Sequence, residues 1–273
     1  MKSLHLNSKN SLYKLWAWAI AGVKAPMRSL VSSFCKVQYL TEVTPSDIVK
    51  RKFHGRSSVF FVQLGSNDGL NGDPLHDLIQ SNPEWRGIFV EPVRYAFDRL
   101  RSNYNDEKRF VFENIAIADS SGEADFFCVS EDAKRELEDL PDWYDQLGSF
   151  NREHLVKHLE GRLEPFILME RVKCETLAGL LDRNHVTKID LLHIDVEGFD
   201  YNILKQIDFL RHSPEVILFE HKHLTPENQR NARFLLAKYE YTLAQFGGDT
   251  VALRRMPPDA TRNRAEVARA RPT

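Results

Sequence analysis

Short apolar runs alternate with helical segments along residues 59–238, and this alternation constrains the fold more than any other feature. Runs this apolar are typical of strands buried on both faces, as in parallel sheets. The strand-like runs are Val59–Leu64, Gly87–Val90, Phe110–Ile115, Ile189–Asp195 and Glu215–Glu220. The helical patterns are Pro74–Gln80, Tyr95–Tyr104, Cys174–Leu181, Tyr201–Ile207 and Pro226–Lys238. The order predicts an α/β fold with a Rossmann-like, doubly wound, mostly parallel sheet.

A different pattern closes this region. Tyr241–Gln245 and Thr250–Leu253 are short strand-like runs on either side of Gly247-Gly248-Asp249, a combination typical of a β-hairpin. We therefore expect a C-terminal antiparallel hairpin at one edge of the parallel sheet. Most dehydrogenase sheets lack such a hairpin.

Composition excludes some classes of protein. Charged residues make up 28% of the 273 residues, and the net charge is only −2. This balance gives no electrostatic reason to expect nucleic acid as a partner. The three cysteines, Cys35, Cys128 and Cys174, show neither zinc-knuckle spacing nor a disulfide framework. A reducing compartment fits this usage, and we expect a cytoplasmic protein.

Both ends of the chain differ from its middle. Leu15–Val23 is an apolar run too short to span a bilayer. We expect a helix that packs on the domain or a partner; a signal-peptide core and peripheral membrane contact are the alternatives. Residues 254–273 carry six arginines and few apolar residues. The predicted division is an N-terminal helical extension at 1–50, a domain at 51–254 and a disordered basic tail at 255–273.

The strongest local motif is Gln63-Leu64-Gly65-Ser66-Asn67-Asp68-Gly69, on the turn after the first strand. Open α/β sheets bind ligands at this edge. Glu91 ends the second strand 22 residues after Gly69, where a carboxylate can accept hydrogen bonds from both ribose hydroxyls. A dinucleotide fingerprint would also require glycine at 67 and 70, and this chain has Asn67 and Leu70. A structural turn is the simpler explanation of the glycines alone.

Acidic and imidazole groups follow the later strands. Asp195 and Glu197 come directly after the fourth strand, where either carboxylate could instead cap the next helix. His221 follows the fifth strand at the same edge, and a structural hydrogen-bonded histidine is its alternative. A divalent metal held by Asp195, Glu197 and His221 is an option that we do not prefer, because no diagnostic ligand spacing is present.

The motifs VQLGSNDG, FVEPVRYAFDRLRSNY, NIAIADSSGEADFF, VKCETLAGLL, IDLLHIDVEGFDYNILK and EVILFEH together resemble the FkbM family of methyltransferases. The resemblance covers about Val59–His223, and IDVEGFD is its most specific part. It implies a class I methyltransferase fold, S-adenosylmethionine as cofactor, and methylation of a hydroxyl on a sugar, glycan or secondary metabolite.

The resemblance also implies roles for single residues. The cofactor pocket would contain Gln63, Gly65, Ser66, Asn67, Asp68 and Gly69. Glu91 would hold the ribose, Asn114 and Ala116 would flank the adenine, and Asp195 would lie near the methionine end. The family's first motif often opens with an acidic residue, and here that position is Gln63. Two consequences are open: a lowered affinity for the cofactor, or pairing of its amino group with another carboxylate, such as Asp68.

The chemistry of a hydroxyl acceptor requires a proton acceptor. His221 is the predicted base, because an imidazole titrates at about 6.5, and Asp195 or Glu197 would orient or replace it. Two alternatives remain: a non-catalytic cofactor-binding or accessory module, which Gln63 favours, and a nicotinamide-dependent oxidoreductase, which the missing glycines disfavour.

A long insert separates the third and fourth strands, at about Cys128–Arg171. Such connections are usually much shorter, and this one would emerge over the methyl donor. It continues into a helix that carries His154 and His158 and reaches Leu159. Aromatic and polar side chains in it suit a binding pocket. We predict that the insert caps the site and binds a small-molecule or carbohydrate acceptor through Trp143, Tyr144, Arg152 and His154, with Phe150 as a further flat surface.

Overall fold

The computed structural model of the chain describes residues 43–255, and its compact unit begins at Thr44. The predicted N-terminal apolar helix and residues 256–273 of the basic tail lie outside the described residues. Helix α2 (Pro45–Lys52) packs against strand β11 (Asp249–Arg254), and its Ile48 and Val49 are buried. The domain therefore starts a few residues before the predicted boundary at 51.

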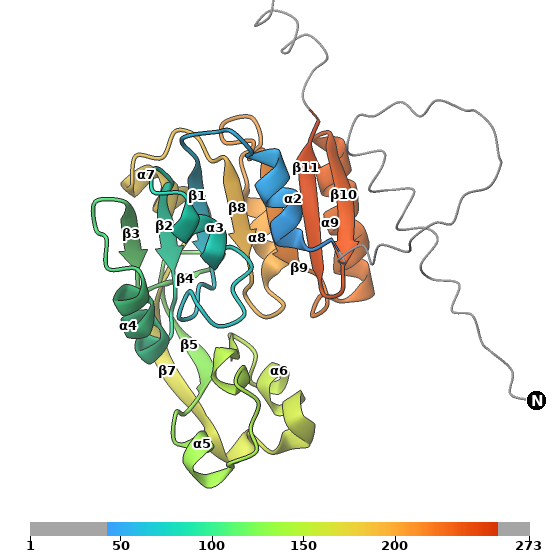
Figure 1. The fold of residues 1–273 in the computed structure, drawn as a ribbon. Coiled ribbons are helices and arrows are strands. Elements are labelled where there is room, and N and C mark those ends of the chain that lie inside the picture. The colour runs from blue at the N-terminus through green and yellow to red at the C-terminus, as the bar shows by residue number, and fades with distance from the viewer. Residues whose placement is uncertain (1–42, 256–273) are drawn as a thin grey trace, which may run out of the picture. The chain divides into compact units, whose positions relative to one another are not determined.

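Seven strands form the main sheet in the order β10-β11-β9-β8-β1-β2-β3 (Figure 1). Strands β9, β8, β1, β2 and β3 are parallel, whereas β11 is antiparallel to both of its neighbours. The strands not yet bounded are β1 (Phe60–Leu64), β2 (Arg86–Val90), β3 (Phe110–Glu113), β8 (Leu191–Ile194), β9 (Val216–Glu220) and β10 (Tyr241–Phe246). The predicted parallel sheet and terminal hairpin are confirmed. The strand order reverses between β1 and β8, so their carboxyl ends form the edge where open α/β sheets bind ligands.

Helices cover both faces of this sheet (Figure 1). Alternate residues of β1 explain why: Val62 and Leu64 join one apolar core, and Phe61 contacts Phe89 and Phe110 on the other face. Helices α7, α8 and α9 contribute to the first core, and α2, α3 and α4 lie on the aromatic face. Their bounds are α3 (His76–Ser81), α4 (Arg94–Asn103), α7 (Leu177–Arg183), α8 (Asp200–Gln206) and α9 (Pro226–Lys238).

A second, smaller sheet carries the insert. Its order is β4-β7-β5-β6, and β5 and β7 pair antiparallel over their whole length. The bounds are β4 (Ala116–Ile117), β5 (Gly122–Val129), β6 (Gly148–Ser149) and β7 (Ile167–Glu175). Residues 130–166 between β5 and β7 form short helices, α5 (Ala133–Glu136), η1 (Tyr144–Gln146), α6 (Arg152–Val156), η2 (His158–Gly161) and η3 (Glu164–Phe166). Figure 1 places them beyond the carboxyl ends of the parallel strands.

One predicted element is partly wrong. Cys174 belongs to β7, and the helix expected at Cys174–Leu181 begins only at Leu177. The end of β7 alternates exposed and buried residues, with Val172 and Cys174 inward, as expected for a strand with one face on a core. Thr176 then starts the helix by accepting a hydrogen bond from the backbone N–H of Gly179.

No helix between residues 43 and 255 has the length and apolar character needed to cross a bilayer.

Candidate active site

A cavity opens at the carboxyl end of the parallel sheet, between the sheet and the insert. Strands β1, β2 and β8 end in it, and the second sheet and the insert close its other side. From the main sheet and its loops it is lined by Gln63, Gly65, Ser66, Asn67, Asp73, Glu91, Ile115, His193, Asp195 and Glu197. From the second sheet and the insert it is lined by Ala116, Ile117, Phe126, Gln146, Gly148 and Phe150. The cavity therefore lies where the strand order predicts a ligand site.

The turn after β1 requires glycine at position 65. Gly65 has a φ of +74°, and a Cβ atom there would lie 1.7 Å from the backbone oxygen of Asp195. The next residue fixes the turn, because the Ser66 hydroxyl donates to the Gln63 carbonyl and accepts the Val90 N–H. The backbone of this turn thus lies directly against Asp195, which follows β8, and borders the cavity.

Glu91 is the buried acid of the site. Its two carboxylate oxygens accept the backbone N–H groups of Asn67 and Val93, each at 2.8 Å. Burial raises the pKa of Glu91 to about 7, although both hydrogen bonds act to lower it. Each oxygen keeps a second lone pair, so the carboxylate can also accept hydrogen bonds from a ligand in the cavity. This is the position expected for a ribose contact.

Three buried polar atoms at the cavity have no hydrogen-bond partner among the described residues. They are Gln63 Oε1, Asp73 Oδ2 and His193 Nδ1. Gln63 and His193 lie directly opposite each other on β1 and β8. Buried polar groups are normally paired, so three unpaired ones at one cavity indicate a polar ligand.

The pKa values of Asp73 and His193 are shifted by burial, which changes the pH at which each group is charged. Burial raises the pKa of Asp73 to about 6, against hydrogen bonds from the Leu75 backbone and the neighbouring Gln63 side chain. Burial lowers the pKa of His193 to about 4, so its imidazole is neutral at pH 7. A carboxylate, an amide oxygen and a neutral imidazole together suit the ammonium group of an amino acid.

Two acids that line the cavity, Asp195 and Glu197, lie next to a third, Glu220. Carboxylate oxygens of Asp195, Glu197 and Glu220 lie within 4.8 Å of one another. Burial and the neighbouring carboxylates raise the pKa of Asp195 well above its usual range. Burial and Glu197 also raise the pKa of Glu220 to about 7, and Lys222 Nζ lies 2.5 Å from its carboxylate. This crowding of acids favours a cationic ligand.

The predicted base does not reach the cavity. His221 Nδ1 lies 3.1 Å from the Thr250 hydroxyl on β11, and His221 is not among the lining residues. Asn114 is also outside: its side-chain amide donates to the backbone oxygens of Glu91 and Pro92 and so fixes the loop after β2. Ala116, predicted beside the adenine, does line the cavity.

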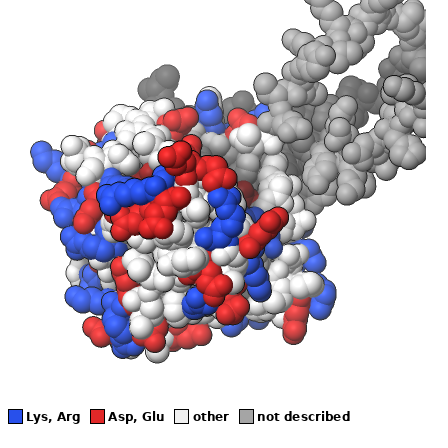
Figure 2. Space-filling model, turned by 90° about the horizontal axis from the view of Figure 1, so that it is seen from below, with Lys and Arg blue, Asp and Glu red and all other residues white. Residues whose placement is uncertain are grey.

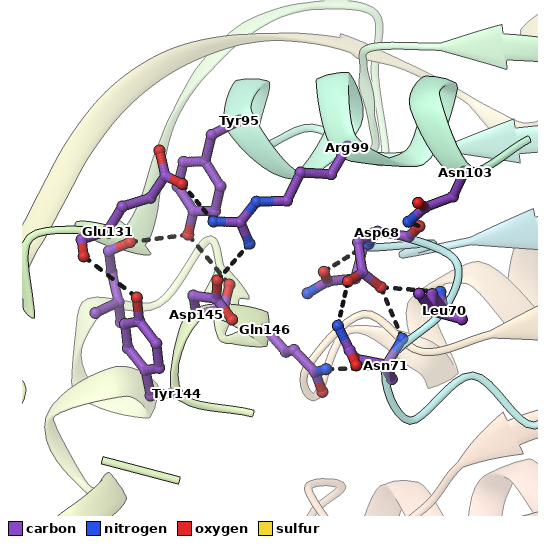
Figure 3. Close-up of polar contacts among 12 residues, drawn as sticks. Asp68, Leu70, Asn71, Tyr95, Arg99, Asn103, Glu131, Tyr144, Asp145 and Gln146 are labelled. Carbon is purple, nitrogen blue, oxygen red and sulfur yellow. Dashed lines mark hydrogen bonds and ion pairs between the residues drawn. The ribbon is translucent and has the colours of Figure 1, made fainter. Parts of the chain in front are cut away.

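Two residues of the first motif act within the protein instead. The Asp68 carboxylate accepts the backbone N–H groups of Leu70 and Asn71, each at 2.9 Å (Figure 3). It therefore closes a turn and is already satisfied. Gly69 has a φ of +68°, and a Cβ atom there would press on helix α4 and on Tyr104. Neither residue lines the cavity.

The insert is fastened to helix α4 (Figure 3). Arg99 forms ion pairs with Asp145, at 2.6 Å, and with Glu131. The Tyr95 hydroxyl donates to the Asp145 carbonyl at 3.1 Å and to a carbonyl at the end of β5. The next residue, Gln146, donates from its side chain to the Asn71 carbonyl at 2.8 Å. These contacts hold η1 over the loop that follows β1.

The predicted acceptor residues separate into two groups. His154 lies at the site, because its Nε2 atom is 2.7 Å from the Glu197 carboxylate. Tyr144 is buried in the core of the insert. Arg152 forms an ion pair with Glu164, which also belongs to the insert. Trp143 is exposed and lies edge-on to His158, which in turn lies next to His154.

Sequence reasoning missed several residues of the site. They are Asp73, His193, Gln146, His158 and His223. His193 interrupts an apolar strand, which is the one signal that could have pointed to it. The others depend on how the insert and loops fold back over the sheet.

The parallel sheet with an antiparallel final pair, and a cavity at its switch point with an acid ending β2, define a class I methyltransferase fold. The chain matches the methyltransferase FkbM domain over residues 63–245, and it belongs to this family. Family and fold together make the chain a methyltransferase.

Several solved methyltransferase structures also match the chain, with low sequence identity and low TM-scores. Precorrin-6y C5,15-methyltransferase from Geobacter metallireducens GS-15 shares 12% identity, with 81% of this chain and 94% of that chain covered and a TM-score of 0.38. Human methyltransferase-like protein 13 in complex with SAH shares 12%, covering 78% and 79%, with a TM-score of 0.38. The METTL16 MTase domain shares 9%, covering 78% and 66%, with a TM-score of 0.43. No protein of curated function matches the chain in sequence.

Proposed function

We propose that the chain is an S-adenosylmethionine-dependent O-methyltransferase that acts on a hydroxyl of a sugar, glycan or secondary metabolite. The observation that carries the proposal is one cavity with two ends of different chemistry. Glu91 follows β2, the unpaired atoms of Gln63, Asp73 and His193 come from β1, the loop after it and β8, and the free carboxyl of Asp195 directly follows β8.

The cavity residues fit the proposed cofactor part by part. Ile115, Ala116 and Ile117 form an apolar wall suited to an adenine ring. Glu91 has free lone pairs for the two ribose hydroxyls. Asp73, rather than the predicted Asp68, offers an unpaired carboxylate oxygen for the amino group. A carboxylate beside Gln63 supports a functional cofactor site over a vestigial one.

Asp195 is the residue that we assign to proton removal. S-adenosylmethionine supplies a methyl group on a cationic sulfur; the new C–O bond forms as the S–C bond breaks, and the hydroxyl proton is released. Asp195 lines the cavity, and no hydrogen bond from the described residues reaches its carboxyl. In its ionised form this carboxylate is therefore free to accept the hydroxyl proton, in the role predicted for His221, and its raised pKa suits a proton acceptor.

The insert is the element that we assign to acceptor choice. Phe150 and Gln146 line the cavity from the insert, and Phe150 contacts Phe126 and Phe199 edge-on. These two residues are better placed for acceptor contact than Tyr144 and Arg152. Figure 2, which views this side of the molecule, shows basic and acidic side chains interspersed. That pattern supports a small or carbohydrate acceptor rather than nucleic acid. A cytoplasmic location stays a prediction.

The test is methyl transfer from methyl-labelled S-adenosylmethionine to hydroxylated carbohydrates, lipids and cell extracts. We expect label in a methyl ether, which resists mild alkali, whereas a methyl ester releases its label. With an acceptor in hand, Asp195→Asn should lower turnover about 10²–10⁴-fold with cofactor affinity nearly unchanged. The exposed Asp208→Asn is the control. Label found on nitrogen or in an ester, or full turnover by Asp195→Asn, would contradict the proposal.

A further inference from the structure

Three histidines surround one glutamate at the boundary between the insert and the main sheet. His154 lies on α6 and His158 on η2, both in the insert. Glu197 follows β8 and His223 follows β9. One potential ligand atom from each of the four residues lies within 4.8 Å of all the others, and all four side chains are half-buried.

The contacts within this cluster orient its rings. His154 Nε2 lies 2.7 Å and His223 Nε2 lies 3.3 Å from the same Glu197 oxygen. His158 Nδ1 lies 2.8 Å from the His154 backbone carbonyl. A carbonyl can only accept, so His158 Nδ1 carries the proton and its Nε2 lone pair is free. A ring nitrogen that donates to a backbone carbonyl while the other stays unprotonated is the usual arrangement of a metal-binding histidine.

The three imidazoles converge on one carboxylate. The ring centroids of His154 and His223 are 4.6 Å apart, and those of His154 and His158 are 4.8 Å apart. This packing places a nitrogen of each ring and a Glu197 oxygen around a common centre. A cation at their centre would accept a lone pair from each ring and from the carboxylate.

We propose that His154, His158, Glu197 and His223 bind one first-row transition-metal ion, with Zn²⁺ as the favoured ion. Three nitrogen ligands and one carboxylate match the ligand types and number of tetrahedral zinc sites. Mg²⁺ and Ca²⁺ prefer sites made of oxygen ligands, so they fit less well.

The site joins two parts of the fold. Two ligands come from the insert and two from loops at the edge of the main sheet, so the ion ties the insert to that edge beside the cavity. His221, the histidine considered for a metal on sequence grounds, is not among the ligands. Metal binding is measured without any methyl acceptor, so the result does not depend on the proposed transfer reaction.

The experiment uses the full chain, purified without a polyhistidine tag. Metal content is measured by elemental mass spectrometry, and Zn²⁺ affinity by competition with a chromophoric chelator. We expect one Zn²⁺ per chain. His158→Ala and His223→Ala should each weaken binding by more than about 100-fold, since loss of even an outer-shell partner costs about 10–100-fold. His221→Ala, two residues from His223, is the matched control and should bind as the wild type. Circular dichroism confirms that each variant is folded.

Co²⁺ provides a second readout. A tetrahedral site should give the visible absorption of tetrahedral Co²⁺ in the wild type and lose it in folded His158→Ala. Absence of binding by the wild type, or unchanged affinity in both histidine variants, would overturn the proposal. Binding that survives both histidine changes but is lost in Glu220→Gln would also overturn it, because the ion would then belong to the carboxylates.

Discussion

At the scale of single residues, burial decides what each acid can do. Asp68 and Asp73 lie five positions apart, and the sequence offered no reason to prefer the second. In the structure the Asp68 carboxylate accepts the backbone N–H groups of Leu70 and Asn71 and so closes a turn. Asp73 keeps an unpaired oxygen at the cavity. Hydrogen bonding within the loop, rather than charge, therefore separates the acid that closes the turn from the acid that we propose for the cofactor's amino group.

Asp73 gives the cofactor site a pH dependence. The pKa of Asp73 is raised to about 6 by burial, so its ionised form, which binds an ammonium group, is present above about pH 6 and lost below it. Cofactor affinity should rise with pH up to about 6, and the rise due to Asp73 should disappear in Asp73→Asn. Calorimetry at several pH values measures this. Glu91 titrates in both proteins, so their difference isolates Asp73.

The exposed Asp77→Asn, on helix α3 just after the loop that carries Asp73, is the control for that titration and should keep the wild-type profile. Parallel pH profiles for the wild type and Asp73→Asn would show that Asp73 does not contact the cofactor's amino group.

Glu91 provides a second residue-scale prediction. Its carboxylate should hold the ribose hydroxyls, so Glu91→Ala should weaken S-adenosylmethionine binding by about 1.5–3 kcal/mol, the scale of hydrogen bonds to a charged group. Glu113 ends the neighbouring strand but pairs with Arg183 outside the cavity, so Glu113→Ala should bind normally. Equilibrium titration compares the two, and equal affinities would remove Glu91 from the ribose site.

At the scale of elements, strong periodicity made the main sheet predictable. The strands of the main sheet and helix α9 lie close to where the apolar patterns placed them, because one face or both of each element pack on a core. The second sheet was missed. Strand β5 and the first part of β7 are partly exposed, and their pairing joins residues about 50 positions apart, which no local pattern encodes.

Contacts between distant segments also limited what could be predicted of the site. Gly65, Glu91 and Asp195 were identified because each follows a predicted strand, and parallel strands bring their carboxyl ends together. His154 and His223 meet at Glu197 only because the insert folds back over the sheet. His221 has the right position in the chain, but its side chain lies against Thr250.

The docking of the insert on α4 leads to an element-scale prediction. Arg99→Ala removes ion pairs to Asp145 and Glu131, which are worth about 0.2–1 kcal/mol each at partly exposed positions. Local opening of residues 130–166 should rise by about twofold to thirtyfold if both pairs contribute. Hydrogen exchange read by mass spectrometry measures this. Arg94→Ala removes an exposed pair with Asp98 on the same helix and is the control. Equal exchange in both variants would contradict the docking role.

At the scale of the whole molecule, the cavity and the proposed metal site both lie at the carboxyl edge of the main sheet. The cavity at the β1–β8 switch point carries the residues that we propose for the cofactor, and Gln146 and Phe150 of the insert line it from the other side. Family membership establishes methyl transfer as the activity of this fold, and the site residues support a cofactor that is cationic and carries a ribose.

The central claim is that this cavity binds S-adenosylmethionine, and a calorimetric titration of the full chain tests it most directly. S-adenosylmethionine and NADH are titrated separately under the same conditions. We predict saturable binding of S-adenosylmethionine at one site per chain, weakened in Glu91→Ala, and no binding of NADH. Absence of saturable S-adenosylmethionine binding by the folded wild-type chain, or tighter binding of NADH, would contradict the account.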